Sequence, residues 1–275
     1  MAASLGTLFS DTFAHLQKNL VTIAVGVVVF GVLMAGMNWY MEGQTRGMAE
    51  IMGVDTNRME ELADMMEAGD EAALQEMMGE FEKTMGGMAA DKSAIFGLYQ
   101  KMAPAFMLIS LLSALLFMAA MTYYTVVALK SSDVQTTLQD VTKLLLPMIG
   151  LQIWIFLRSF AWIPILGVLL AIVLGPRFIL APVILIKEKK GVFASASASF
   201  ERTKGYWGKI FGNMFVVAIV GVISVAILSR IAGVLGMEVA VVVTALLSQV
   251  FIAYLITFAT KLAVSIMGGG KVKPV

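Results

Sequence analysis

The chain has 275 residues, of which 59% are hydrophobic and only 14% are charged, and its net charge is +1. Soluble proteins carry about 25% charged residues, whereas the mean hydropathy of +0.86 is typical of a protein embedded in lipid. Cysteine is absent and His15 is the single histidine. These counts exclude disulfides, thiolate metal sites, a cysteine nucleophile and any site that needs several histidines. We expect no metal and no cofactor.

An amphipathic helix is predicted at the N-terminus. Ser4 is a suitable N-cap, because its hydroxyl can accept a hydrogen bond from a backbone N–H of the first turn. We expect residues 1–18 to form a helix lying in the membrane interface, and a helix packed on the bundle is the alternative. The apolar side chains that share one face at helical spacing are Leu5, Leu8, Phe9, Phe13 and Leu16.

Six apolar stretches follow, each near the length of about 20 residues that a helix needs to cross the hydrocarbon core. The predicted fold is therefore an all-α polytopic membrane protein. Its transmembrane domain covers 19–41 and 102–268, and a short tail follows at 269–275. No signal peptide is expected, because the first residues lack a cationic segment and the first apolar run is too long. The expected spans are about 19–41, 104–129, 143–162, 164–187, 209–232 and 238–267.

Basic residues gather in the loops and termini that would lie on one side of this six-span arrangement. Lysine and arginine are enriched on the cytoplasmic side of membrane proteins. We therefore expect both termini in the cytoplasm and the protein in the cytoplasmic (inner) membrane. One connection holds a dense group, the basic belt, which would attract anionic lipid headgroups. The basic belt comprises Lys187, Lys189, Lys190, Lys204 and Lys209.

Residues 42–101 form a long insertion on the opposite, extracytoplasmic side, with thirteen acidic and five basic residues. Helix-start signals at Asn57 and Asp70, with a break at Gly69, predict a helical hairpin outside the membrane. Its methionine-lined face would contact its own bundle, a second copy or a partner protein. A Cu(I) site is the alternative, but methionine more commonly fills irregular apolar contacts. The face comprises Met59, Leu62, Met66, Leu74, Met77, Met78, Phe81 and Met85.

Arg177 is the charge near the middle of the expected span at 164–187. A charged side chain at the centre of the bilayer costs about 3 kcal/mol or more. No Asp or Glu lies at that depth in the expected spans. Either backbone carbonyls near Pro176 and polar side chains such as Gln152 satisfy the guanidinium, or Arg177 holds an anion such as a lipid phosphate.

The connection at 188–213 carries small residues that allow helices to approach closely, either within the chain or between subunits. The residues expected to serve this packing are Ser195, Ser199, Gly205, Gly208 and Gly212.

The same region has an ordered pattern of an intramembrane arginine, a proline, an acidic-glycine turn and a small-residue helix. It resembles the membrane domain fused to some glycerophosphoryl diester phosphodiesterases, and the stand-alone, uncharacterised bacterial inner-membrane relatives of that domain. The resemblance implies a six-helix integral membrane unit. The phosphodiesterase catalytic domain is absent from this chain, so the resemblance implies no enzymatic activity. The residues that fit the pattern are Arg177, Pro182, Glu188, Gly191, Ser199, Lys204, Gly205 and Trp207.

Two functional hypotheses follow. The first is a non-enzymatic membrane module that binds membrane lipids and associates with itself or with a partner membrane protein. The alternative is a transporter or channel for an anionic or amphipathic solute, with Arg177 in its pathway. An enzyme is a third class, but its candidate acid–base groups Glu188, Glu201 and His15 are scattered. No nucleic acid is expected as a partner.

Overall fold

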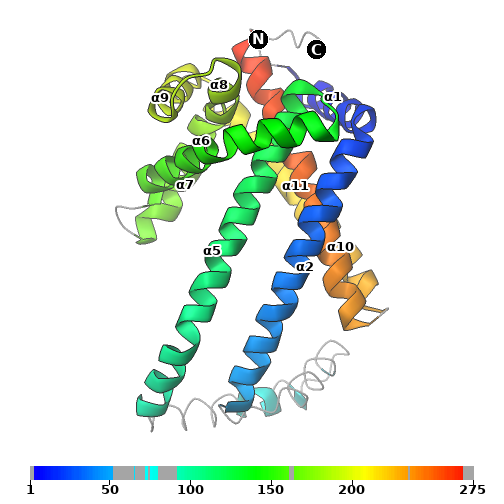
Figure 1. Ribbon diagram of the computed structural model, residues 1–275, viewed down its shortest axis with the longest axis vertical. Coiled ribbons are helices and arrows are strands. Elements are labelled where there is room, and N and C mark those ends of the chain that lie inside the picture. The colour runs from blue at the N-terminus through cyan, green and yellow to red at the C-terminus, as the bar shows by residue number, and fades with distance from the viewer. Residues whose placement is uncertain are drawn as a thin grey trace. The chain divides into compact units, whose positions relative to one another are not determined.

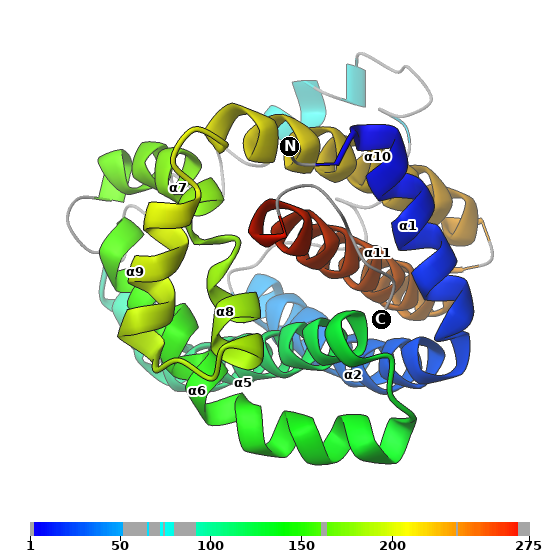
Figure 2. The same ribbon diagram turned by 90° about the horizontal axis from the view of Figure 1, so that it is seen from above.

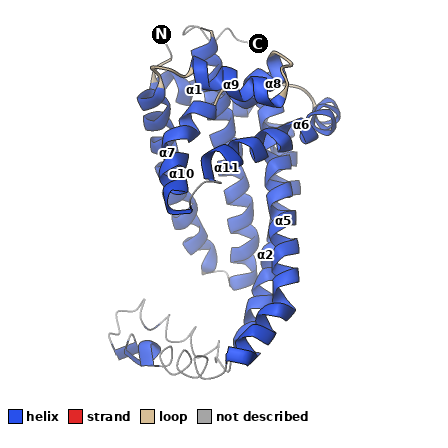
Figure 3. Cartoon of the chain, turned by 90° about the vertical axis from the view of Figure 1, so that its left-hand side faces the viewer, coloured by secondary structure: helices blue, strands red, loops and turns tan. Residues whose placement is uncertain are grey.

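The computed structural model describes residues 3–51, 65, 72–73, 75–79, 92–160, 164–234 and 236–268. Every regular element among these residues is a helix (Figure 3), which confirms the predicted all-α class. The helices with assigned bounds are α1 (Leu5–Lys18), α2 (Leu20–Ile51), α5 (Lys92–Lys130), α6 (Val134–Phe160), α7 (Pro164–Phe178), α8 (Ala181–Lys187), α9 (Val192–Arg202), α10 (Trp207–Gly233) and α11 (Met237–Met267).

The chain divides into two compact units. The first unit contains Met1–Ala35 and Ala114–Val275, and the second contains Gly36–Ser113. The division falls inside α2 and α5, so each unit holds a part of both helices. The candidate site lies entirely in the first unit.

Five helical segments of the described chain are long and apolar enough to cross a membrane, as expected for a polytopic membrane protein. They are Leu20–Gly47, Ala103–Lys130, Val134–Ser159, Trp207–Gly233 and Val239–Met267.

The stretch expected as a single span at 164–187 is broken into two short helices. α7 has 15 residues and α8 has 7, both fewer than the about 20 needed to cross the hydrocarbon core. Pro182 has no N–H to donate to the carbonyl of Phe178, four residues earlier, so the helical ladder is interrupted there. The expected continuous helix does not form, and a sixth crossing stays a prediction.

The N-terminal helix α1 packs along α11. Its Ser4 hydroxyl accepts a hydrogen bond from the Thr7 N–H at 3.3 Å, which confirms the predicted N-cap. Leu8 is fully buried, and the ring of Phe9 lies 5.5 Å from that of Phe258 in α11. Phe13, expected on the same face, is instead 59% exposed. The packed part of the apolar stripe is therefore narrower than the sequence suggested.

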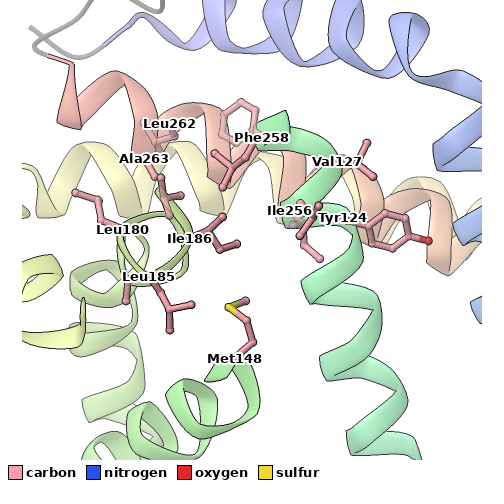
Figure 4. Packing of buried hydrophobic residues seen from close by; sticks show 14 of the residues in the cluster. Tyr124, Val127, Met148, Leu180, Leu185, Ile186, Ile256, Phe258, Leu262 and Ala263 are labelled. Atoms are coloured by element: carbon pink, nitrogen blue, oxygen red, sulfur yellow. The ribbon is translucent and has the colours of Figure 1, made fainter. Parts of the chain in front are cut away.

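The core of the first unit surrounds α11, which contacts α1, α8 and α10 and lies between them when seen from above (Figure 2). Side chains of α5, α6, α8 and α11 meet there, including Tyr124, Met148, Ile186 and Phe258 (Figure 4). Lipid tails are as apolar as these side chains, so close van der Waals packing, rather than exclusion from water, holds such helices together.

Glycines permit two of the closest approaches in this core. A Cβ placed on Gly221 in α10 would lie 1.8 Å from the ring of Phe251 in α11, and one on Gly26 in α2 would lie 2.6 Å from the ring of Tyr123. Only glycine leaves room for either ring.

The second half of α6 runs alongside α9. The rings of Trp154 and Phe193 lie 4.7 Å apart, and a Cβ on Gly150 would lie 3.6 Å from Val192. Pro147 stands within α6, and Figure 1 shows α6 crossing the direction of α11 rather than following it. α6, α7 and α9 therefore form one packed group at one end of the first unit.

Most of the predicted methionine-lined face lies outside the described residues, namely Met59, Leu62, Met66, Leu74, Phe81 and Met85. Of its remaining members, Met77 is half-buried and Met78 is 64% exposed. The predicted hairpin stays a prediction. Elsewhere in the second unit, Arg46 and Glu42 form an exposed ion pair one turn apart on α2, at 3.0 Å.

Candidate functional site: the α7–α9 junction and an apolar pocket

A side chain of α9 forms hydrogen bonds to the backbone at the break between α7 and α8. The Ser199 hydroxyl donates to the Arg177 carbonyl at 2.7 Å and accepts from the Leu180 N–H at 3.2 Å. The Thr203 hydroxyl also reaches the Arg177 carbonyl, at 3.3 Å. Ser199 and Thr203 are fully buried. Two backbone groups that the broken helix leaves free are thus satisfied by α9.

Arg177 is not in the middle of a long span, as its sequence position suggested, but one residue from the end of α7. Its guanidinium carbon lies 5.1 Å from the centre of the Phe200 ring on α9, within the range of a cation–π contact. Its Nη1 atom is buried and has no hydrogen-bond partner. None of the expected polar neighbours, such as Gln152, bonds to it.

Arg158 approaches the same ring. Its guanidinium carbon lies 5.9 Å from the centre of Phe200. The predicted span at 143–162 would place Arg158 near the end opposite to the connection that contains α9. In the structure, the second half of α6 runs along α9 instead, and this brings Arg158 to Phe200. Sequence reasoning could not have found that Arg158 and Arg177 approach the same ring, since this depends on how α6 packs on α9.

The basic belt is partly neutralised by neighbouring carboxylates. Glu188 binds Arg202 through both carboxylate oxygens, and Lys190 lies 2.9 Å from it. These hydrogen bonds from Arg202 and then Lys190 lower the pKa of Glu188 from 4.5 to about 2. Lys204 pairs with Glu201 at 2.6 Å.

Three further lysines of the belt, Lys187, Lys189 and Lys209, are exposed. The belt therefore presents exposed cationic side chains on this face.

The residues predicted to pack helices behave in two ways. Ser195 and Ser199 are fully buried on α9. Gly205 has a φ of +81°, so it serves a turn that a residue with a Cβ would strain. A Cβ on Gly208 or Gly212 would meet no atom within 4 Å. Neither glycine mediates a close approach within the described chain, and a contact with a second copy stays a prediction.

An apolar pocket of about 480 Å³ lies beside the junction, in the usual size range of ligand pockets. Its walls come from the ends of α5 and α6, from the α7–α8 break, and from α10 and α11. Apolar side chains such as Phe211, Met214 and Leu255 dominate, with Gln152, Thr125 and Thr260 as the polar members.

The pocket opens on the outer apolar surface. Two of its lining side chains, Ile172 and Phe215, are 46% and 53% exposed. Ile172, Gly175 and Pro176 on one side of α7, with Ile179 just after its end, form a stripe that lines the pocket. Arg177 does not line it. Sequence reasoning missed this pocket because five separated segments build it, although the two prolines of the broken helix gave a hint.

His15 is a structural residue of α1. Its Nε2 lies 3.1 Å from the Val127 carbonyl oxygen of α5 and 3.3 Å from the Asn19 side-chain amide. Burial, with the nearby charge of Lys261, lowers the pKa of His15 from 6.5 to about 4. Among the described residues, no cluster of three or more His, Cys, Asp or Glu side chains could hold a metal ion.

Comparison with known proteins finds no matching family model, no matching curated protein and no matching solved structure. The resemblance to the phosphodiesterase-associated membrane domain therefore stays a prediction.

Proposed function

We propose that this protein is a non-enzymatic integral membrane module that binds membrane lipid, with a hydrocarbon chain held in the pocket between the α7–α8 break and α10. The pocket carries the proposal, because it is apolar and opens on a surface of exposed apolar side chains. A lipid chain can enter such an opening from the bilayer without crossing water.

The pocket lining favours binding over catalysis or transport of a charged solute. Its residues include no carboxylate, histidine, lysine or arginine. A general acid or base would need such a group within hydrogen-bond reach of the reacting atom. An anion pathway through Arg177 gains no support from this pocket, because Arg177 faces α9 on another side of α7.

The same proposal includes which side of the membrane each part of the chain faces. α1 and the C-terminal part of α11 pack together through Phe9 and Phe258, which supports two termini on one side of the membrane. The basic belt supports the cytoplasm as that side. Residues 42–101 would then be extracytoplasmic, in a protein of the inner membrane. Self-association or a partner membrane protein would use the methionine-lined face.

Filling the pocket tests the proposal. Ala218 of α10 lines the pocket, whereas Ala226, two turns later on the same helix, is exposed and outside it. We expect Ala218→Phe to weaken binding of dioleoylglycerol at least tenfold, and Ala226→Phe to leave it unchanged. Native mass spectrometry of detergent-released protein, titrated with this lipid, measures both. Equal binding by wild type and Ala218→Phe would overturn the proposal.

A further inference from the structure

We propose that Arg158 and Arg177, which both approach the Phe200 ring, form a binding site for the phosphate of an anionic phospholipid. The site is separate from the apolar pocket and supplies the headgroup recognition that the pocket lacks. The identification of the phosphate as part of a lipid rests on the proposed function, whereas the anion site itself rests on the two guanidiniums.

The two arginines approach one ring from different helices. Arg158 lies two residues from the end of α6 and Arg177 one residue from the end of α7. Their guanidinium carbons lie 5.9 and 5.1 Å from the centre of the same ring. Phe200 is itself held in place by packing on Phe178, with ring centres 6.1 Å apart. A fixed ring orients both cationic groups, and this reduces the side-chain entropy lost when they bind a ligand.

No carboxylate of the described chain balances these charges. The two nearest in sequence to the ring are already engaged, Glu201 with Lys204 and Glu188 with Arg202 and Lys190. The Nη1 atom of Arg177 is buried without an acceptor, and a buried donor without a partner is energetically unfavourable. Two like charges with an unsatisfied donor therefore favour an anion as the missing partner.

A phosphate group suits this arrangement better than a carboxylate. The planar guanidinium fork forms two parallel hydrogen bonds to phosphate oxygens, and a phosphate presents enough oxygens for two forks. Arginine also keeps its charge when it is partly buried.

The position beside the pocket points to a lipid as the source of the phosphate. Pro176 and Phe178, on either side of Arg177, both line the pocket. A phospholipid with its phosphate at Phe200 could therefore place a chain in the pocket around the last turn of α7. The exposed lysines of the basic belt lie on the same connection and would attract an anionic membrane surface.

The test compares dioleoyl phosphatidylglycerol with dioleoylglycerol, which has the same chains and no phosphate, by native mass spectrometry of the full chain. We expect the wild type to bind phosphatidylglycerol at least tenfold more tightly. Arg158→Gln and Arg177→Gln should each raise its dissociation constant about tenfold, the effect of losing one charge-assisted hydrogen-bond pair. Neither change should alter binding of dioleoylglycerol.

Two control variants test whether a loss of lipid binding is specific to the arginine site or follows from any loss of positive charge or from misfolding. Lys143→Gln removes one exposed charge of α6 that lies outside the basic belt and should change phosphatidylglycerol binding less than twofold. Arg177→Lys keeps the charge without the fork, and we expect a severalfold loss of affinity. Equal losses in Lys143→Gln and Arg158→Gln, or no loss in Arg158→Gln and Arg177→Gln, would overturn the site.

The remaining outcomes distinguish this inference from the proposed function. If inorganic phosphate stabilises the wild type against heat but not Arg177→Gln, and phosphatidylglycerol binds no better than dioleoylglycerol, the anion is soluble and the lipid assignment is wrong. If Ala218→Phe binds dioleoylglycerol normally while the arginine variants lose phosphatidylglycerol, the pocket proposal fails and the phosphate site stands.

Discussion

Replacing Ser199 with alanine tests how the α7–α8 break is held together. The serine hydroxyl satisfies the Arg177 carbonyl at 2.7 Å and the Leu180 N–H at 3.2 Å. After Ser199→Ala, the Thr203 hydroxyl at 3.3 Å still reaches the carbonyl, but the buried Leu180 N–H loses its acceptor. Leaving the buried Leu180 N–H unsatisfied costs about 1–3 kcal/mol, and the hydrogen bond lost at the Arg177 carbonyl adds about 1 kcal/mol. We therefore expect a loss of about 2–4 kcal/mol in unfolding free energy.

Ser197 provides a matched control on the same helix. It is exposed, so Ser197→Ala should change the unfolding free energy by less than about 0.5 kcal/mol. Reversible unfolding in mixed micelles, followed by circular dichroism, measures both variants. The double variant Ser199→Ala/Thr203→Ala should lose more than the two single changes combined, because both hydroxyls serve one carbonyl.

The reasoning is refuted if Ser199→Ala unfolds within 0.5 kcal/mol of Ser197→Ala, a difference no larger than that of an ordinary surface substitution. That result would mean that the Arg177 carbonyl and the Leu180 N–H find hydrogen-bond partners without Ser199. It would also remove Ser199 as the residue that fixes the position of Arg177 relative to α9.

Two further predictions concern the core and its pH dependence. Gly221→Ala should lower the unfolding free energy by about 1–3 kcal/mol, because the new Cβ would lie 1.8 Å from the Phe251 ring; unchanged stability in mixed-micelle unfolding would mean that the ring moves aside freely. The pKa of His15 is lowered from 6.5 to about 4 in the folded chain. As the pH decreases, the unfolded chain therefore takes up a proton before the folded chain does. The unfolding free energy should fall by about 3 kcal/mol as the pH decreases from 6.5 to 4. His15→Gln should remove this dependence, and an unaltered pH profile in that variant would show that another group causes it.

Sequence could predict those elements whose formation depends on residues close to one another in the chain. The Ser4 cap and the apolar runs of α2, α5, α10 and α11 depend on neighbouring residues alone, and all of them form. The run at 164–187 satisfied the same length criterion but is broken, because a hydropathy average does not register two prolines. Phe13 likewise has the right helical spacing, yet most of its side chain is exposed.

The candidate site could be predicted only in part. Sequence singled out Arg177 and Ser199 but assigned the first to mid-membrane and the second to general packing. Arg158 was not among the expected site residues, because a regular span at 143–162 would have carried it to the opposite side. The apolar pocket had no sequence signal of its own, since its walls come from segments far apart in the chain.

By itself, the sequence determined that this is a helical membrane protein with a basic belt in one connection, because transfer to lipid and charge distribution are properties of short stretches of chain. Only the tertiary structure decided what Arg177 faces and where a lipid chain could enter. Those properties follow from the hydrogen bonds of α9 to the α7–α8 break and from the packing of α6 along α9, and both depend on contacts between residues separated by nineteen or more positions.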